Sequence, residues 1–326
     1  MTLGRRGLLA AGLVLPFATA AATGAKEAWT RPAGLAPDAS VALWPDRYLT
    51  APEGLTERVV QRSDDPQASD RMLEHIVRPR LDIFRPANPN GAAMILAPGG
   101  GYRYVVIDKE GYELARWLAA RGVTVYVLFY RLPGDGWTNG ADVPLADAQR
   151  AVRLVRSRAR QDGIDPARVA FGGFSAGGHV ATSLLTRFNA GVYDPVDGAD
   201  VLPARPDALA GLYPVVSMDP AIAHAGSRAK LLGAASEAAR EALYSPERNA
   251  RPDQPPLFLL HAEDDNVVKV ENSFCLRAAT RAVGTPCESH FFERGGHGFG
   301  LMKTAGLPVA AWPELLWAWL GSHGIV

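Results

Sequence analysis

The sequence predicts an α/β protein built on a mostly parallel, doubly wound sheet with helices on both faces. Three observations predict this class. Apolar runs typical of buried strands alternate at least five times with segments of helical spacing. The connections between them are short, which implies right-handed crossovers and parallel strands. Side chains able to carry chemistry follow the expected strands, at the carboxyl edge where ligands bind in open sheets of this kind.

The strands are expected from composition. Residues 91–97 (GAAMILA) form a continuous apolar run, as in a strand buried on both faces, and residues 123–130 (VTVYVLFY) are the most strongly β stretch of the chain. Residues 71–84 alternate, and Pro79 limits them to an antiparallel edge strand or a bulge. The other strands are expected at residues 169–174, 209–216, 257–261 and 288–293.

Helical spacing separates these strands. Residues 110–121 stop at Gly122, and Glu110 at their start is expected to interact with the helix dipole. Residues 145–161 are amphipathic, with basic residues outward. Residues 217–251 are expected to form an irregular, partly helical insertion that acts as a small cap. The remaining helices are expected at residues 176–185, 268–283 and 311–320.

The first 25 residues have the layout of an export signal. Arg5 and Arg6 precede an apolar stretch, and small residues suited to signal peptidase follow it. The paired arginines resemble a twin-arginine signal, which is an address rather than a membrane anchor. A disordered or surface-helical N-terminus is the alternative. We therefore expect a periplasmic or secreted protein with a signal peptide at 1–25, an extended arm at 26–55 and one catalytic domain at 56–326.

Charge and cysteine content exclude some functions. The chain has 34 basic and 34 acidic residues, so there is no electrostatic case for binding nucleic acid or an anionic membrane. Much of a predicted helix separates Cys275 from Cys287, about 12 Å at 1.5 Å per residue, which is too far for a disulfide. We expect two buried free thiols. No metal or cofactor is implied, because the sequence has no clustered ligand spacing and no phosphate-binding loop.

A G-x-S-x-G pentapeptide, residues 173–177, lies between an expected strand and an expected helix. At such a tight turn the central residue adopts strained backbone angles, and flanking glycines avoid collisions. The turn would make the hydroxyl of Ser175 project beyond the edge of the sheet, beside a helix N-terminus that favours negative charge. A plain glycine-rich turn is the alternative. The strand before it, the helix after it and the partners described next favour a nucleophile.

A serine nucleophile needs a base, and a carboxylate that orients the base. Among the seven histidines, His297 combines a position after the last expected strand with a glycine-rich loop that can carry an imidazole over the sheet. Asp265 follows the preceding expected strand and is the favoured orienting acid. Asp264 is the competing candidate, and helix N-capping is the alternative role for either aspartate. The order serine, aspartate, histidine differs from both protease orders.

Consecutive glycines follow the first buried strand. Acyl transfer develops an oxyanion, which backbone N–H groups held in place beforehand stabilise. Gly100 and Gly101 are expected to present two such groups, and Ala176 a third. A flexible turn is the alternative.

Aromatic residues on loops near the expected site are candidates for stacking on a sugar ring. They are Tyr102, Tyr104, Trp137 and Phe299. Packing in the core is an equal alternative for each of them.

Several segments together resemble the acetyl xylan esterase branch of the α/β-hydrolase carbohydrate esterases, which is related to hormone-sensitive-lipase-type esterases. The segments span about residues 70 to 320 and read PGGGY, YRL (130–132), PLADAQRAVRLVRS, GFSAGGHVA, LYPVVSM, LLHAEDDNVVKVENS and GGHGFGL. The resemblance implies an α/β-hydrolase fold with Ser175 as nucleophile, His297 as base and Asp265 as its orienter. It further implies that Gly100, Gly101 and Ala176 donate to the oxyanion.

The resemblance also implies an activity. We expect a serine esterase that removes short acyl groups, above all acetyl, from a carbohydrate such as xylan through an acyl-enzyme. A general short-chain carboxylesterase is the main alternative, followed by a peptidase of related fold and a catalytically silent binding protein. The expected partner is an acylated carbohydrate or another small ester, with no nucleic acid and no membrane anchor.

Overall fold

The computed structural model describes Met1, residues 34–65 and residues 69–326. The predicted signal peptide therefore lies outside the described residues, Met1 aside. The strands are β1 (Ala39–Ala42), β2 (Arg58–Gln61), β3 (Arg71–Glu74), β4 (Arg80–Phe84), β5 (Ala93–Ala97), β6 (Val105–Val106), β7 (Thr124–Phe129), β8 (Val169–Phe174), β9 (Ala208–Leu212), β10 (Leu257–Ala262) and β11 (Cys287–Phe292). The α-helices are α1 (Glu113–Ala119), α2 (Val143–Ser157), α3 (Ala159–Asp162), α4 (Ser175–Arg187), α5 (Ala225–Leu232), α6 (Ala238–Leu243), α7 (Glu271–Ala282) and α8 (Trp312–Ser322).

One large sheet organises the molecule, in the order β1-β4-β7-β5-β8-β9-β10-β11. Its strands from β7 to β11 run parallel, whereas β4 pairs antiparallel with both β7 and β1. A smaller antiparallel sheet has the order β2-β3-β6. The predicted mostly parallel, doubly wound sheet is confirmed. Because β8 lies near its middle, the serine turn at the end of β8 has strands on both sides.

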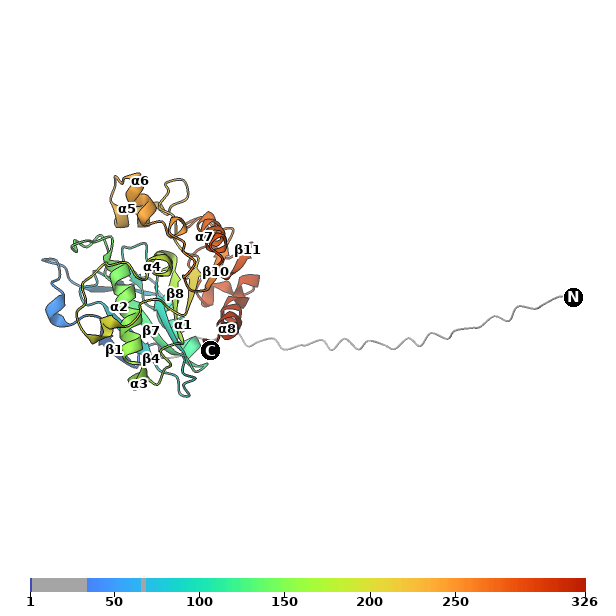
Figure 1. Cartoon of the computed structure of the whole chain (residues 1–326), viewed down its shortest axis with the longest axis horizontal. Helices are drawn as coiled ribbons and strands as arrows, with labels where there is room; N and C mark the ends of the chain where they lie inside the picture. Colours follow the sequence, from blue (N-terminus) through green and yellow to red (C-terminus); the bar gives the residue numbers. More distant parts are fainter. Residues whose placement is uncertain (2–33, 66–68) are drawn as a thin grey trace.

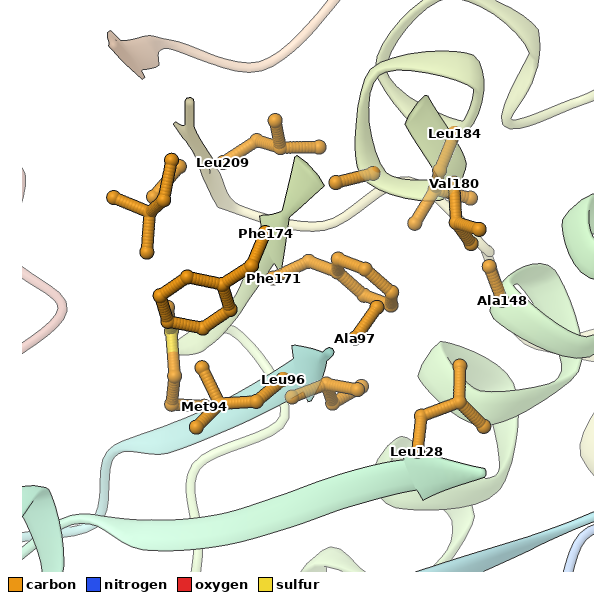
Figure 2. Close-up of a cluster of buried hydrophobic side chains, with 14 of the residues drawn as sticks. Met94, Leu96, Ala97, Leu128, Ala148, Phe171, Phe174, Val180, Leu184 and Leu209 are labelled. Atoms are coloured by element: carbon orange, nitrogen blue, oxygen red, sulfur yellow. The ribbon is translucent and has the colours of Figure 1, made fainter. Parts of the chain in front are cut away.

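Helices cover both faces of the large sheet (Figure 1). Helix α4 packs on β8 and β9 and carries α2, while α1 packs on β4 and β7 and α8 packs on β10. Successive side chains of β8 point to opposite faces of the sheet and pack against the helices on each face. The ring of Phe174 lies 6.4 Å from that of Trp312 in α8, whereas Phe171 points toward Val180 of α4 (Figure 2). The nucleophile strand is thus fixed from both faces by apolar packing.

The segment 71–84 differs from its prediction as a single edge strand. It forms two strands in two sheets, β3 in the small sheet and β4 between β1 and β7 in the large one. The chain turns between them at His75, whose φ of 55° is left-handed, and Pro79 precedes β4. A proline cannot donate a ladder hydrogen bond, so it separates the strands instead of interrupting one.

The predicted arm contributes the outermost strand of the large sheet. Its residues 39–42 form β1, which pairs with β4. Just beyond β1, the indole N–H of Trp44 donates to Asp147 in α2 at 2.7 Å, and Arg150 donates to the carbonyl of Leu43 at 2.9 Å. Both contacts are buried. Residues 39–44 of the arm are therefore part of the sheet layer and do not merely lie on the domain.

The insertion at 217–251 contains α5 and α6 and stands at the top of the view in Figure 1. Other predicted elements agree in type and shift at their ends. Strand β9 stops at Leu212, because Tyr213 has a left-handed φ of 38° and Pro214 follows. Cys275 and Cys287 are free, as predicted, and both are half-buried instead of fully buried. No helix of the described chain is both long and apolar enough to cross a membrane.

Candidate active site

Ser175 sits at the turn between β8 and α4 with a left-handed φ of 51°. A non-glycine residue in this region is strained, as the pentapeptide predicted. A Cβ on Gly173 would lie 2.1 Å from the carbonyl oxygen of Gly177, and one on Gly177 would lie 2.1 Å from that of Ala97. Only glycines therefore allow α4 to start this close to β8 and to the end of β5.

His297 reaches Ser175 from the loop after β11. Its Nε2 lies 2.9 Å from the Oγ of Ser175, and its Nδ1 lies 2.6 Å from Oδ2 of Asp265. Because an ionised carboxylate only accepts, Nδ1 carries the proton and Nε2 is free to accept from the serine hydroxyl. The structure thus brings together three residues that are far apart in the sequence, in the arrangement that activates a serine.

Asp265, in the loop after β10, is oriented by the backbone. Its Oδ1 accepts hydrogen bonds from the N–H groups of Val267 and Val268, both at 2.9 Å, which leaves Oδ2 for His297. The competing candidate, Asp264, points elsewhere. Its Oδ1 accepts from the N–H groups of Gly295 and Gly296 at 2.9 and 2.7 Å. Asp264 therefore holds the loop that carries His297 and does not contact the imidazole.

A second histidine contacts the same carboxylate. Nε2 of His261 lies 2.9 Å from the carbonyl oxygen of Val268 and 3.2 Å from Oδ2 of Asp265. Since a carbonyl only accepts, Nε2 of His261 carries the proton, and Nδ1 accepts from the hydroxyl of Ser273 at 2.8 Å. Burial alone would raise the pKa of Asp265, but hydrogen bonds from His261 and His297 and the charge of His297 hold it below its usual value.

The loop after β5 has the backbone shape expected for anion stabilisation. Gly100 and Gly101 have φ values of 140° and 64°, and both line the pocket beside Ser175. Within the described residues, neither of their N–H groups donates to a protein acceptor. The N–H of Ala176 belongs to the first turn of α4, where no intrahelical acceptor exists. These three donors are available to a developing oxyanion.

Glu110 links the two loops of the site, a role that the sequence did not reveal. It lies in a π-helical turn, Asp108–Tyr112, instead of at an α-helix start. Its buried carboxylate accepts from the N–H of Gly99 at 2.8 Å and from the hydroxyl of Tyr213 at 3.1 Å. Tyr213 packs edge-on against His297, with ring centroids 5.1 Å apart, and its oxygen accepts from the N–H of Gly300. Glu110 therefore positions both the glycine loop and the histidine loop.

We expect Glu110→Ala to lower kcat by about 10- to 100-fold, because small misplacements of reacting groups cost rates of this order. The substitution leaves the N–H of Gly99 and the hydroxyl of Tyr213 without their acceptor. Glu110→Gln retains one acceptor oxygen and should recover part of the loss. Steady-state kinetics with 4-nitrophenyl acetate would measure both variants. A kcat for Glu110→Ala within twofold of wild type would contradict this positioning role.

Ser175 and His297 open into a pocket of about 280 Å³. The cap insertion supplies His224 to its wall, and Val267 lies beside it. Nδ1 of His224 accepts from the N–H of Ser227 at 3.2 Å, so the neutral ring carries its proton on Nε2. Burial, together with the charge of His297, lowers the pKa of His224. No motif in the sequence indicates a role for His224, because only the folded cap places it near the serine.

The prediction that loop aromatics stack on a sugar ring is wrong for three of the four residues. Tyr102 is buried and lies with its hydroxyl 2.7 Å from Nδ1 of His179. Phe299 is buried against Tyr213, with ring centroids 4.7 Å apart. Trp137 is also buried and lines a different pocket, near Tyr48. For Tyr102 and Phe299 the position on a loop predicted proximity to the site but not the direction of the ring, because apolar rings pack inward where the core has room for them. Tyr104 is half-buried and does line the pocket of Ser175.

His179 in α4 provides a prediction on pH. Burial, chiefly, lowers its pKa from 6.5 to about 4. Below pH 6.5 the unfolded chain therefore binds a proton that the folded protein does not, so stability falls as the pH drops toward 4. The integrated loss is about 3 kcal/mol at 1.36 kcal/mol per pKa unit.

Urea unfolding of wild type and His179→Asn between pH 7 and pH 4 would test this. The variant should be less stable at neutral pH and should lose less stability on acidification. Parallel stability curves for the two proteins would contradict the assignment.

The sheet topology and the position of the serine turn define the chain as an α/β-hydrolase in fold. The family model BD-FAE matches residues 81–279. That match covers more than half of the chain, and the protein belongs to the BD-FAE family.

Individual proteins agree with this assignment. An acetylxylan esterase of Xylanibacter ruminicola is 33% identical over 225 residues, covering 68% of this chain and 44% of that protein. Endo-1,4-beta-xylanase B of Butyrivibrio fibrisolvens is 35% identical over 205 residues, covering 63% of this chain and 32% of that protein. The chain thus spans less than half the length of these two curated relatives.

Solved structures extend the similarity over most of the chain. An acetyl ester-xyloside bifunctional hydrolase of Caldicellulosiruptor lactoaceticus is 32% identical with a TM-score of 0.71, covering 90% of this chain and 99% of that one. Apo esterase 2 of Thermogutta terrifontis is 24% identical with a TM-score of 0.62, covering 84% of this chain and 96% of that one. At that identity the second similarity shows the fold alone.

Proposed function

We propose that this protein is a serine esterase that removes acetyl groups from acylated carbohydrates such as xylan through an acyl-enzyme. The observation that carries the proposal is the hydrogen-bonded series from Ser175 through His297 to Asp265, with distances of 2.9 and 2.6 Å. The names of the relatives, an acetylxylan esterase and an acetyl ester-xyloside hydrolase, support the choice of substrate. A general short-chain carboxylesterase is the second candidate, because the pocket of about 280 Å³ also suits a simple ester.

The proposed reaction has two acyl transfers. The Oγ of Ser175 attacks the ester carbonyl carbon while Nε2 of His297 takes the hydroxyl proton. The carbonyl oxygen becomes an oxyanion and accepts hydrogen bonds from the N–H groups at positions 100, 101 and 176. Collapse breaks the bond to the sugar oxygen, which leaves as an alcohol with the proton of His297. Water then loses a proton to His297 and attacks the acyl-serine. Collapse breaks the bond to the Oγ of Ser175, which takes the proton back from His297, and the acid is released.

Acetate release from acetylated xylan would test the proposal. The wild-type protein should release acetate from the polysaccharide. Its ratio of kcat/KM for acetylated xylan to kcat/KM for 4-nitrophenyl acetate should exceed the same ratio for an esterase without sugar contacts. Ser175→Ala provides the blank for both substrates. Hydrolysis of the aryl ester without acetate release from the polysaccharide would favour the general carboxylesterase.

We also propose that the protein is exported to the periplasm or beyond by its N-terminal residues. Arg5 and Arg6, the apolar stretch after them and the small residues around Ala20 support this reading. When both arginines are replaced by lysine in the full chain, the esterase activity should stay inside the cell instead of being exported. An unchanged distribution of activity between cell fractions would contradict a twin-arginine route.

A further inference from the structure

Three cationic residues line the pocket of Ser175. Arg62 follows β2, Arg103 belongs to the loop after the glycines, and Lys109 lies in the π-helical turn. The one acidic residue in the described lining is Glu110, whose two oxygens already accept from Gly99 and Tyr213. The pocket therefore carries an excess of positive charge on a chain whose net formal charge is zero.

Two of these cations have no protein partner in the described part of the chain. Arg103 and Lys109 make neither an ion pair nor a side-chain hydrogen bond there, and Arg103 is exposed. Arg62 differs, because it pairs with Asp70 and lies 5.5 Å from the centroid of the Tyr104 ring. Cations that are left unpaired around a pocket create a positive potential, which concentrates anionic ligands.

The position of Lys109 indicates which part of a substrate this charge faces. Its Nζ lies 3.3 Å from the point where a Cβ on Gly298 would stand, next to His297 in the sequence. His297 must return its proton to the leaving alcohol, so the alcohol has to lie on the His297 side of the ester carbonyl. Lys109 thus borders the subsite of the alcohol. Arg103 adds a second positive charge to the wall of the pocket, just after the glycine loop.

We propose that the site favours acetyl esters of sugars that carry a carboxylate, with Arg103 and Lys109 binding the carboxylate group on the alcohol side. This inference rests on the proposed function and narrows its substrate class to uronate-bearing carbohydrates. A guanidinium and an ammonium are the groups that recognise carboxylates, the first by paired hydrogen bonds and the second as a point charge. In either case the substrate is an ester that carries a carboxylate. The alternative to a carboxylate on the sugar alcohol is a carboxylate on the acyl group.

A matched pair of substrates would test the alcohol side. One is an O-acetylated methyl uronoside, and the other is the uronamide of the same sugar, which has nearly the same shape without the charge. We expect kcat/KM for acetate release to be about tenfold higher for the uronate, since exposed pairs each contribute modestly. In about 1 M salt, where the Debye length is about 3 Å, this ratio should fall toward one. Comparing 4-nitrophenyl acetate with 4-nitrophenyl hemisuccinate tests the acyl side, where no preference for the charged ester is expected.

The variants Arg103→Gln and Lys109→Gln should each lower the uronate-to-uronamide ratio, and the double variant should bring it close to one. Neither side chain bonds to the described protein, so both variants are expected to fold. Arg160→Gln is the matched control, because Arg160 is exposed in α3 and does not line the pocket. It should leave the ratio unchanged.

The outcomes separate this inference from the proposed function. Equal kcat/KM for uronate and uronamide in the wild-type protein would overturn the inference while leaving the carbohydrate esterase intact. A preference that survives in the double variant would overturn the roles of Arg103 and Lys109. A preference for the hemisuccinate alone would move the carboxylate to the acyl side and overturn the placement proposed here. Absence of acetate release from both sugars, with hydrolysis of the aryl ester, would count against the proposed function itself.

Discussion

Ser175→Ala is expected to lower kcat by about 10⁶-fold, because removal of a serine nucleophile costs roughly this factor in comparable enzymes. The substitution removes the oxygen that His297 contacts at 2.9 Å and adds no bulk to the turn. The variant should therefore fold like the wild type and retain the N–H groups of Gly100 and Gly101. Hydrolysis of 4-nitrophenyl acetate would measure the loss.

A covalent probe separates this explanation from general damage. A phosphonylating reagent should add one group to the wild-type protein at Ser175, located by mass spectrometry, and none to Ser175→Ala. Ser157→Ala is the control, since Ser157 ends α2 at the surface and donates to the carbonyl of Leu154. It should retain both activity and labelling. Labelling of Ser175→Ala at another serine, with activity preserved, would refute the proposed nucleophile.

Asp265→Asn is expected to lower kcat by about 10⁴-fold through the tautomer of His297. The N–H groups of Val267 and Val268 both donate to Oδ1, so an asparagine must place its oxygen there and its NH₂ toward the imidazole. Nδ1 of His297 would then have to accept, which puts the ring proton on Nε2 and prevents that atom from accepting the serine proton. The N–H of His261 would face the same NH₂ group and could not relieve the conflict.

Asp264→Asn is the matched control. Asparagine keeps an oxygen for the N–H groups of Gly295 and Gly296, so we expect a loss of less than about tenfold. Steady-state kinetics of the two variants between pH 6 and pH 9 would compare them. Equal losses in both variants, or a loss of only a few-fold for Asp265→Asn, would show that the orienting acid has been misassigned.

The part of the site that could be predicted from sequence is the part specified by local signals. Strand β8 has the predicted bounds, and Ser175, Asp265 and His297 each follow a parallel strand, which places them at one edge of the sheet. Glycines with left-handed φ mark the loop at Gly100 and Gly101, because few other residues adopt that backbone.

The remaining residues of the site depend on partners that are distant in sequence. Glu110 and Tyr213 meet across 103 positions, and His261 acquires its role only because Asp265 turns back toward it. Tyr102 and Phe299 lie on the predicted loops beside the site, but the direction of each side chain follows from the space that the core offers. No spacing rule contains that information.

The strand supplied by residues 39–42 has a consequence for handling the protein. A polypeptide shortened to the predicted catalytic boundary at residue 56 would lose β1 and the Trp44 anchor together. The ladder groups of β4 that now pair with β1 would then face solvent, and an open strand edge is a template for self-association. Preparations that begin after residue 50 should therefore form oligomers or precipitate even though every proposed catalytic side chain is present.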